Sequence, residues 1–431
     1  MKRPRLVVIG NGLAGTRTLE ELLRIAPDLY DISVFGAEPY ASYNRTLLSP
    51  VLAGEQGIDQ TTLHPRAWYA EHGVQLHLGK EVVSVNRIRR EVMADDCSVA
   101  EYDRLVIATG SKPCVLQVPG TDLEGVHAWR DIADTRALID ATRRYRRAVV
   151  IGGGVSGLEA ANGLMLRGMQ TTVVQLAPWL MERQLDDVAG ALLQRVLQAK
   201  GLKFALGAMT QGFIGDRYHG RGGRVMAVQL KDGREIPADL VVVATGICPN
   251  TELARCMGLH CTQDGRGGRG GISVNDTLQS TTDARIYAVG ECAAHRGVTH
   301  GLVAPLNEQA KVCATHLAQR GMGHYTGGPV GTQLNISGID VFSAGDFMGG
   351  AGTEQLVRSD AQAGIYKKLV IKEDQLVGAC LVGDAVHASA YFKLLREGRK
   401  LGKLRDQLMS GERTCAAPAG GPTPSAATSA I

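Results

Sequence analysis

The stretch Leu6-Val7-Val8-Ile9-Gly10-Asn11-Gly12-Leu13-Ala14-Gly15 decides the fold, because its pattern returns as Ala148-Val149-Val150-Ile151-Gly152-Gly153-Gly154-Val155-Ser156-Gly157. Each copy places a short apolar run before Gly-x-Gly-x-x-Gly, which is typical of a strand, a tight turn and the start of a helix. The glycines let backbone N–H groups approach a pyrophosphate, and the helix N-terminus adds about half a positive charge. Two such fingerprints predict two dinucleotides bound side by side, a flavin on one and a nicotinamide on the other.

A second pair of matching runs follows the fingerprints. Leu105-Val106-Ile107-Ala108-Thr109-Gly110 and Leu240-Val241-Val242-Val243-Ala244-Thr245-Gly246 are both apolar and both end in Ala-Thr-Gly. The chain therefore repeats a whole nucleotide-binding unit. This predicts an α/β protein with two Rossmann-like domains, one inserted in the other. We expect a discontinuous dinucleotide-binding domain at 1–118 and 250–324, and a second one inserted at 119–249; the family resemblance described below implies that the first is the FAD-binding domain and the second the NAD(P)H-binding domain.

The composition changes after these units. Residues 325–411 alternate short β-rich runs with one helical segment, and predict a small α+β interface domain. Residues 412–431 are mostly Ala, Pro, Ser, Thr and Gly, which cannot bury a core, and predict a disordered tail. Two Gly/Arg loops, 220–224 and 266–270, are expected to be mobile surface turns rather than RNA-binding segments.

Charge and hydropathy exclude several classes of protein. The net charge of +4 is too balanced to predict a nucleic-acid or membrane partner, and no apolar run approaches the ~20 residues of a membrane helix. Residues 1–9 are expected to form a buried first strand, not a signal peptide. Nine cysteines without a CxxC motif or metal-ligand spacing predict no metal site and unpaired thiols in a reducing cytoplasm.

Two polar residues stand near the positions where a dinucleotide fold recognises a ribose. Glu38 lies 23 residues after Gly15, close to where an acid takes a ribose hydroxyl, although a solvated loop glutamate is the alternative. In the second unit Gln175 stands where that acid is expected, and no arginine follows at once to bind a 2′-phosphate. This favours NADH and leaves dual specificity open.

Beyond these patterns, the chain resembles the two-dinucleotide flavoprotein reductases, in the branch of rubredoxin and ferredoxin reductases. Within it, the resemblance is greatest to the flavoprotein module of the assimilatory nitrite reductase large subunit and to the electron-transfer subunit of assimilatory nitrate reductase. The motifs that carry it are Tyr43-Asn44-Arg45-Thr46-Leu47-Leu48-Ser49, Met181-Glu182-Arg183-Gln184-Leu185-Asp186, Tyr287-Ala288-Val289-Gly290-Glu291-Cys292, Gly301-Leu302-Val303-Ala304-Pro305-Leu306 and Phe342-Ser343-Ala344-Gly345-Asp346.

This resemblance implies that FAD lies on the first fingerprint. Thr109-Gly110 and Gly290-Glu291 would then lie beside its pyrophosphate and ribityl chain. Val82 resembles the position whose backbone meets the adenine, with a plain strand residue as the alternative.

The resemblance also places Asn44 and Arg45 at the flavin. The Arg45 cation would stabilise the reduced isoalloxazine, unless it is only a surface salt-bridge residue.

NAD(P)H would occupy the second fingerprint, with Gly246 and Gln175 beside it. Glu159 resembles the acid that reaches toward the nicotinamide and the flavin. The alternative is a glutamate that only complements the dipole of its helix.

Cysteines that would relay electrons through a dithiol are absent from residues 42–49, and Cys415 stands alone where an iron–sulfur cluster would need four. The resemblance therefore implies hydride transfer from NAD(P)H to FAD, and delivery of electrons to a metal centre on a separate protein. Alternatives are a stand-alone rubredoxin or ferredoxin reductase, an oxidase that uses oxygen, and a non-catalytic flavin- or NAD-binding sensor. A homodimer also stays open.

Overall fold

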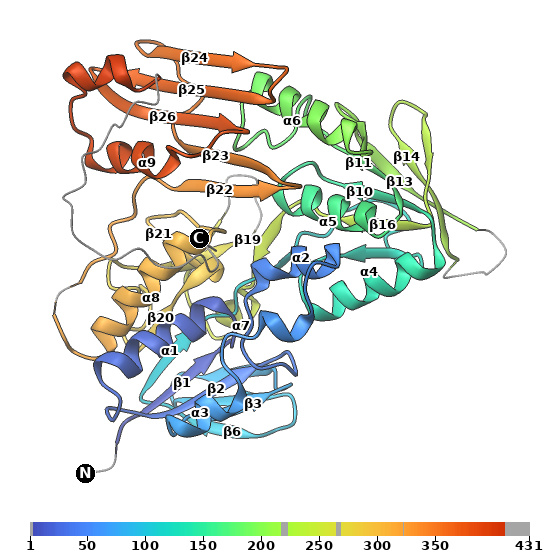
Figure 1. The fold of residues 1–431 in the computed structure, drawn as a ribbon. Helices are drawn as coiled ribbons and strands as arrows, with labels where there is room; N and C mark the ends of the chain where they lie inside the picture. The colour runs from blue at the N-terminus through green and yellow to red at the C-terminus, as the bar shows by residue number, and fades with distance from the viewer. Residues whose placement is uncertain (1–2, 217–222, 264–268, 322, 410–431) are drawn as a thin grey trace.

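The computed structural model describes residues 3–216, 223–263, 269–321 and 323–409. Its main bodies are two parallel sheets and one antiparallel sheet, which lie at three corners of the molecule (Figure 1). The α/β fold class predicted from the two fingerprints is confirmed. The tail from 412 lies outside the described residues, as do most of the two Gly/Arg loops.

The first parallel sheet contains the first fingerprint and has the strand order β20-β7-β1-β2-β3. Leu6, Val7, Val8 and Ile9 are all buried, as expected for a central parallel strand covered on both faces. Helices α1 and α8 pack together on one face (Figure 1). The bounds are β1 (Arg5–Ile9), α1 (Leu13–Ile25), β2 (Asp31–Gly36), β3 (Gln75–Leu78), β7 (Arg104–Ile107), β20 (Ile286–Ala288) and α8 (Val303–Leu317).

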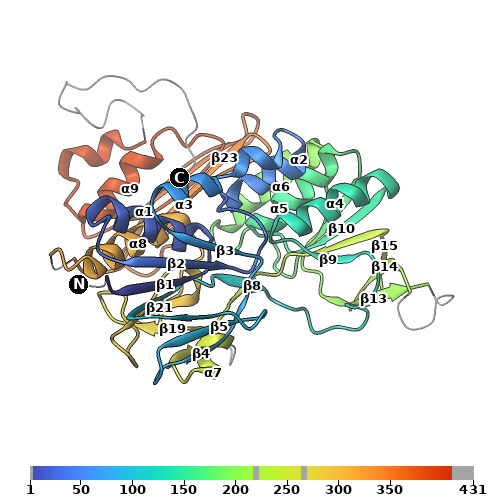
Figure 2. The same cartoon turned by 90° about the horizontal axis from the view of Figure 1, so that it is seen from below.

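The second parallel sheet repeats this plan around the second fingerprint, with the order β12-β11-β10-β16-β9. It stands beside the first sheet when the molecule is viewed from below (Figure 2). Its elements are β9 (Val126–Ala128), α4 (Ile132–Arg144), β10 (Arg147–Ile151), α5 (Val155–Leu166), β11 (Gln170–Val174), α6 (Asp187–Ala199), β12 (Lys203–Ala205) and β16 (Leu240–Val243).

One close approach explains why each fingerprint is paired with an Ala-Thr-Gly run. Gly10 has a φ of +110°, and a Cβ there would lie 2.2 Å from the carbonyl oxygen of Ala108. Gly152 has a φ of +119°, and its Cβ would lie 2.3 Å from the carbonyl oxygen of Ala244. Only glycine permits this backbone conformation and this contact. Each turn therefore crosses the end of the neighbouring strand of its own sheet.

The third sheet is antiparallel, with the order β22-β23-β26-β25-β24, and helix α9 packs against it. The expected strands and helix of this region are present, but the edge strand β24 was not predicted. The bounds are β22 (Gly331–Ile336), β23 (Ile339–Gly345), β24 (Glu354–Asp360), β25 (Ile365–Lys372), β26 (Gln375–Val382) and α9 (Ala388–Glu397).

A buried ion pair joins this sheet to the second parallel unit. Asp186 caps helix α6 by accepting a hydrogen bond from the backbone N–H of Ala189. The same carboxylate accepts hydrogen bonds from the Tyr366 hydroxyl at 2.8 Å and from the Lys368 ammonium at 3.0 Å, both on β25. Because charges buried without partners are costly, this network fixes how the two bodies meet.

The remaining elements are short and, in the described part of the chain, include three separate three-stranded sheets. They are α2 (Leu48–Ala53), α3 (Arg66–Glu71), β4 (Val82–Asn86), β5 (Glu91–Ala94), β6 (Val99–Glu101), β13 (Thr210–Gly215), β14 (Val225–Leu230), β15 (Glu235–Pro237), α7 (Glu252–Cys256), β18 (Cys261–Gln263), β19 (Arg269–Val274) and β21 (Ala293–His295). Within the described ranges, no helix is long and apolar enough to cross a membrane.

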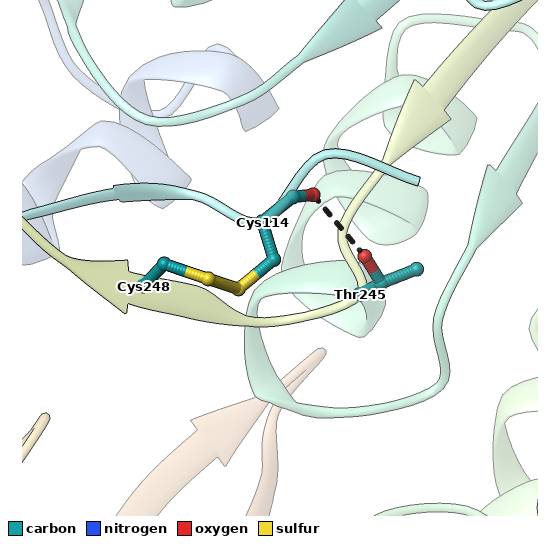
Figure 3. Close-up of a disulfide and its surroundings, with 3 residues drawn as sticks. All are labelled: Cys114, Thr245 and Cys248. Carbon is teal, nitrogen blue, oxygen red and sulfur yellow. Dashed lines mark hydrogen bonds between the residues drawn. A yellow bond between two sulfur atoms is a disulfide. The ribbon is translucent and has the colours of Figure 1, made fainter. Parts of the chain in front are cut away.

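The two segments that connect the parallel sheets run side by side. Strand β8 (Ser111–Pro113) pairs antiparallel with β17 (Ile247–Pro249). Directly beside this pairing, Cys114 and Cys248 form a disulfide with their Cα atoms 5.3 Å apart (Figure 3). The Thr245 hydroxyl donates a 3.5 Å hydrogen bond to the Cys114 carbonyl at the same place.

This disulfide shows that the prediction of unpaired thiols is wrong for Cys114 and Cys248. The two cysteines are 134 residues apart in the sequence, so no local spacing motif could have paired them. The topology brings them together, because the chain leaves and re-enters the first unit at one point. The argument from unpaired thiols to a reducing compartment therefore loses its basis.

Removal of this cross-link is expected to destabilise the oxidised protein. A disulfide that closes a long loop contributes about 2–4 kcal/mol. A reductant should lower the melting temperature of the wild type, but not that of a Cys114→Ser/Cys248→Ser double variant, as measured by circular dichroism. Equal melting curves with and without reductant, together with alkylation of both thiols in the untreated protein, would contradict the expectation.

Candidate functional site

A cavity of about 1140 Å³ lies where the three bodies meet, and both fingerprints contribute to its wall. Its size suits an extended dinucleotide and part of a second ligand. Predicted site residues that line it are Gly10, Gly12, Leu13, Ala14, Glu38, Arg45, Val82, Thr109, Gly110, Val155, Ser156, Glu159 and Glu291. The antiparallel sheet and α9 close one side through Gln333, Leu334, Phe342 and Phe392.

Other predicted residues do not line this cavity. They are Gly15, Asn44, Gly152, Gly154, Gly157, Gln175, Gly246 and Gly290. Two of these glycines pack against the glycine turns of the fingerprints. A Cβ on Gly15 would lie 2.1 Å from the Gly10 carbonyl oxygen, and one on Gly157 would lie 1.9 Å from that of Gly152. The Asn44 side chain accepts the backbone N–H of Thr46 at 3.1 Å.

The glycine turns fit a bound pyrophosphate. Gly12 and Gly154 are the N-caps of α1 and α5, and neither helix start is capped by a side-chain hydrogen bond. Apart from the adjoining residues, no atom of the described part of the chain lies within 4 Å of a Cβ built on either glycine. Both helix starts therefore offer backbone N–H groups and open space, which is the arrangement that a phosphate needs.

Unpaired polar atoms at the cavity also point to a polar ligand. Asn11 Nδ2 and Arg130 Nε are buried and have no hydrogen-bond partner among the described residues, and both residues line the cavity. A buried donor without a partner is destabilising, so these atoms suit a ligand that accepts hydrogen bonds. FAD, with its phosphates, hydroxyls and ring carbonyls, provides such acceptors.

Glu38 and Arg45 form a pair in this cavity. The Glu38 carboxylate accepts hydrogen bonds from the Arg45 guanidinium and from the Tyr43 hydroxyl, both at 2.7 Å. Burial is the main reason that the pKa of Tyr43 is raised, so its hydroxyl stays a donor. Adenosine and isoalloxazine lie at opposite ends of FAD. Because Glu38 and Arg45 are in contact, Glu38 cannot bind the ribose while Arg45 contacts the isoalloxazine.

A second charged pair crosses between the two parallel units. Arg130 follows β9 of the second sheet, and its guanidinium donates hydrogen bonds to Glu291 of the first unit and, at 2.9 Å, to the Ser111 hydroxyl. Ser111 in turn donates to the Glu291 carboxylate at 2.5 Å. Burial lowers the pKa of Arg130, and the negative charge of Glu291 opposes this effect.

The sequence analysis missed Arg130, Ser111 and Tyr43. A usable signal for Arg130 was its place just after an edge strand, since ligands of open α/β sheets bind outside the carboxyl ends of the strands. Ser111 follows the Thr-Gly motif directly, and Tyr43 belongs to the Tyr-Asn-Arg motif.

Glu159 lies on α5, one turn into the helix, and lines the cavity. Burial raises the pKa of its carboxyl to about 7, and a hydrogen bond with Ser49 opposes the shift. A carboxyl with such a pKa can hold or release a proton near neutral pH, which suits a group beside a reacting cofactor. Its place in the first turns of α5 also suits the alternative, a glutamate that complements the dipole of its helix.

Gln175 is buried and does not face the cavity. Its Oε1 accepts the backbone N–H of Gly153 at 2.7 Å, and its Nε2 donates to Glu182 at 2.8 Å. The amide is therefore occupied by protein partners.

The comparisons with known proteins agree with this geometry. Residues 4–320 match the family model of the pyridine nucleotide-disulphide oxidoreductases, and residues 329–399 match the rubredoxin NAD+ reductase C-terminal domain. Helix α2 and the turn before it contain no cysteine, so the dithiol for which the family is named is absent from that segment.

Among curated proteins, the chain is 46% identical to the nitrite reductase [NAD(P)H] of Bacillus subtilis over 92% of this chain and 48% of that protein. It is 40% identical to the assimilatory nitrate reductase electron transfer subunit of the same organism over 96% of this chain and 52% of that protein. The chain thus spans about half the length of these relatives.

A solved structure matches at nearly full length. The ferredoxin reductase for the CYP199A2 system from Rhodopseudomonas palustris superposes with a TM-score of 0.82 at 25% identity, over 92% of this chain and 96% of that chain. Together with the two fingerprints on one cavity, these matches establish the family. The chain belongs to the pyridine nucleotide-disulphide oxidoreductases and is an FAD- and NAD(P)H-dependent flavoprotein reductase.

Proposed function

We propose that this reductase is the electron-transfer component of an assimilatory nitrate or nitrite reductase. The observation that carries this proposal is the identity of 46% and 40% to the two nitrogen-assimilation proteins. It takes electrons from NADH and passes them to an iron–sulfur or other metal centre on a separate protein. The second relative is an electron transfer subunit, which supports this direction of electron flow.

FAD is proposed to lie along the first fingerprint, where it supplies the chemistry that accepts a hydride and releases single electrons. Gly12 and the N-terminus of α1 bind its pyrophosphate, and Val82 meets its adenine. Because Glu38 and Arg45 are in contact, we assign both to the adenosine and phosphate half of the ligand. Arg130, through its free Nε, and Glu291 then orient the flavin half.

NADH is proposed to bind at the second fingerprint, with its pyrophosphate at Gly154 and the N-terminus of α5. Ser156 and Glu159 in the first turns of this helix reach the cavity that also holds the first fingerprint. Glu159 then stands where the nicotinamide and the flavin meet and positions the nicotinamide amide. Its side chain is half-buried in the cavity wall at this place.

A second candidate is a stand-alone ferredoxin reductase. The match to the Rhodopseudomonas palustris ferredoxin reductase over 96% of that chain favours it. It requires the same nucleotide sites and the same direction of electron flow, and differs only in the acceptor protein.

An anaerobic titration tests the function. NADH is expected to bleach the visible flavin absorbance within seconds, and NADPH is expected to do so more slowly. Adding the purified nitrate reductase or nitrite reductase should then restore the absorbance faster than ferredoxin or rubredoxin does. Faster recovery with ferredoxin would select the second candidate, and a flavin that neither nucleotide bleaches would refute both.

The two open glycines provide a matched pair of variants. Gly12→Ala should fold but retain FAD about tenfold less tightly or worse, because a methyl group takes the place of the close pyrophosphate contact. Gly154→Ala should keep its FAD and lose NADH affinity to a similar degree. FAD content after dialysis and NADH affinity by calorimetry are the measurements, with melting curves as the control for folding. The proposed sites would be wrong if the two variants behaved alike.

Glu159 predicts a pH dependence of stability. Its pKa is about 7 in the folded protein against 4.5 for the free group, so its stabilising contribution is complete below about pH 4.5 and is lost as pH rises through 7. Glu159→Gln should therefore gain stability relative to the wild type between about pH 5 and pH 8, by about 3 kcal/mol at most.

Thermal melts of the wild type and of this variant across that range measure the gain. Glu55→Gln, which removes an exposed carboxyl, is the control and should run parallel to the wild type. If the melting temperature of Glu159→Gln changed with pH in the same way as that of the wild type, the raised pKa of this carboxyl would be refuted.

A further inference from the structure

The loop after β11 is packed onto the second fingerprint. The backbone N–H of Met181 donates to the Gly153 carbonyl at 3.0 Å, and the Gly153 N–H donates to the Gln175 side chain at 2.7 Å. A Cβ on Gly153 would lie 2.9 Å from a methyl carbon of Leu180. The loop and the glycine turn therefore form one rigid unit at the place where the second fingerprint meets its nucleotide.

This loop is held in an unusual conformation. Met181 is fully buried and has a φ of +53°, in the left-handed region that residues other than glycine rarely adopt. Its carbonyl accepts the N–H groups of Gln184 and Leu185 at 2.7 and 2.8 Å. Such strained backbone persists where the surroundings enforce it, and it often marks a functional position. Here the conformation turns the next residue, Glu182, back toward Gln175.

Gln175 fixes the orientation of the Glu182 carboxylate. Because the Gly153 N–H engages Oε1 of Gln175, the Nε2 group of that side chain faces Glu182 and donates to it at 2.8 Å. Gln175 is buried, whereas Glu182 is exposed. The Glu182 carboxylate is therefore oriented at the surface. Its hydrogen-bond partner Gln175 directly follows β11, the second strand of this nucleotide-binding unit.

Counted from its fingerprint, Glu182 stands at a distance similar to that of Glu38 in the first unit, although it follows β11 by eight residues and Glu38 follows β2 by two. Glu38 follows Gly15 by 23 residues, and Glu182 follows Gly157 by 25. In dinucleotide-binding folds an acid about 20 residues past the fingerprint binds the adenosine ribose hydroxyls, and a 2′-phosphate is tolerated only where a cation replaces it. Gln175 occupies the usual position, but its amide is already bonded within the protein.

We propose that Glu182, positioned by Gln175, binds the adenosine ribose hydroxyls at the second fingerprint and repels the 2′-phosphate of NADPH. Gln175 is then a positioning residue and makes no direct contact with the nucleotide. This inference rests on the proposed binding of NAD(P)H at that fingerprint and adds the residue that selects NADH.

The test measures the binding of the adenosine half alone. ADP-ribose and its 2′-phosphate carry the ribose in question but no nicotinamide, so they cannot react with the flavin. Isothermal titration calorimetry with the FAD-loaded protein gives both affinities. The wild type should prefer ADP-ribose. Glu182→Gln keeps the size of the side chain and removes its charge, and should reduce that preference about tenfold or more, since hydrogen bonds to charged groups are among the strongest.

Asp187→Asn is the matched control, because it removes an exposed acidic charge five residues further on, in the first turn of α6. It should leave the preference unchanged. An unchanged preference in Glu182→Gln would overturn the inference, and so would a wild type that prefers the 2′-phosphate, which would assign the site to the neighbouring Arg183. If the wild type bound neither probe, the nucleotide site of the proposed function would itself be refuted.

Discussion

The contact between a glycine and a strand-end carbonyl oxygen is the constraint on which the rest of this structure depends. At Gly10 and again at Gly152, the turn after the first strand of a unit crosses the carbonyl of an alanine at the end of the neighbouring strand. The crossing is possible only without a Cβ and only at positive φ. It directs the following helix start toward the carboxyl edge of the sheet. Because the constraint is met twice, two helix N-termini serve one cavity.

Two charged pairs cross the boundaries between the three bodies. Arg130 of the second unit reaches Glu291 of the first, and Asp186 of the second unit reaches Lys368 of the antiparallel sheet. Such pairs contribute little net stability when buried, but breaking one partner is costly. Their effect is to fix the relative placement of the three bodies, and so the shape of the space between them. Hydride transfer depends on that placement, because reacting groups must be held at close range.

The sequence alone predicted those parts of the fold that are determined by short stretches of neighbouring residues. The two fingerprints, the two Ala-Thr-Gly runs and the buried parallel strands follow from patterns of fewer than about ten residues, which strand and turn physics can interpret. Strand β24 was missed because it is an exposed edge strand with charged ends, and its sequence lacks the alternation that marks a half-buried strand.

The site was harder to predict than the fold. Arg130 with Glu291, Cys114 with Cys248, and Gln175 with Glu182 are contacts that the chain creates only on folding. Gln175 illustrates the difficulty, since its position in the sequence predicts a ribose contact, while its amide forms hydrogen bonds within the protein.

The pairing of β8 with β17 also has a consequence for how this protein can evolve. Every strand of the second parallel sheet comes from residues 126–243, and the chain enters and leaves this region between two cysteines whose Cα atoms are 5.3 Å apart. A segment whose ends lie so close can be replaced without moving its host, as is typical of inserted domains. Residues 126–243 are therefore an exchangeable segment of the chain, provided that a replacement keeps the contacts of Arg130 with Glu291 and of Asp186 with Lys368.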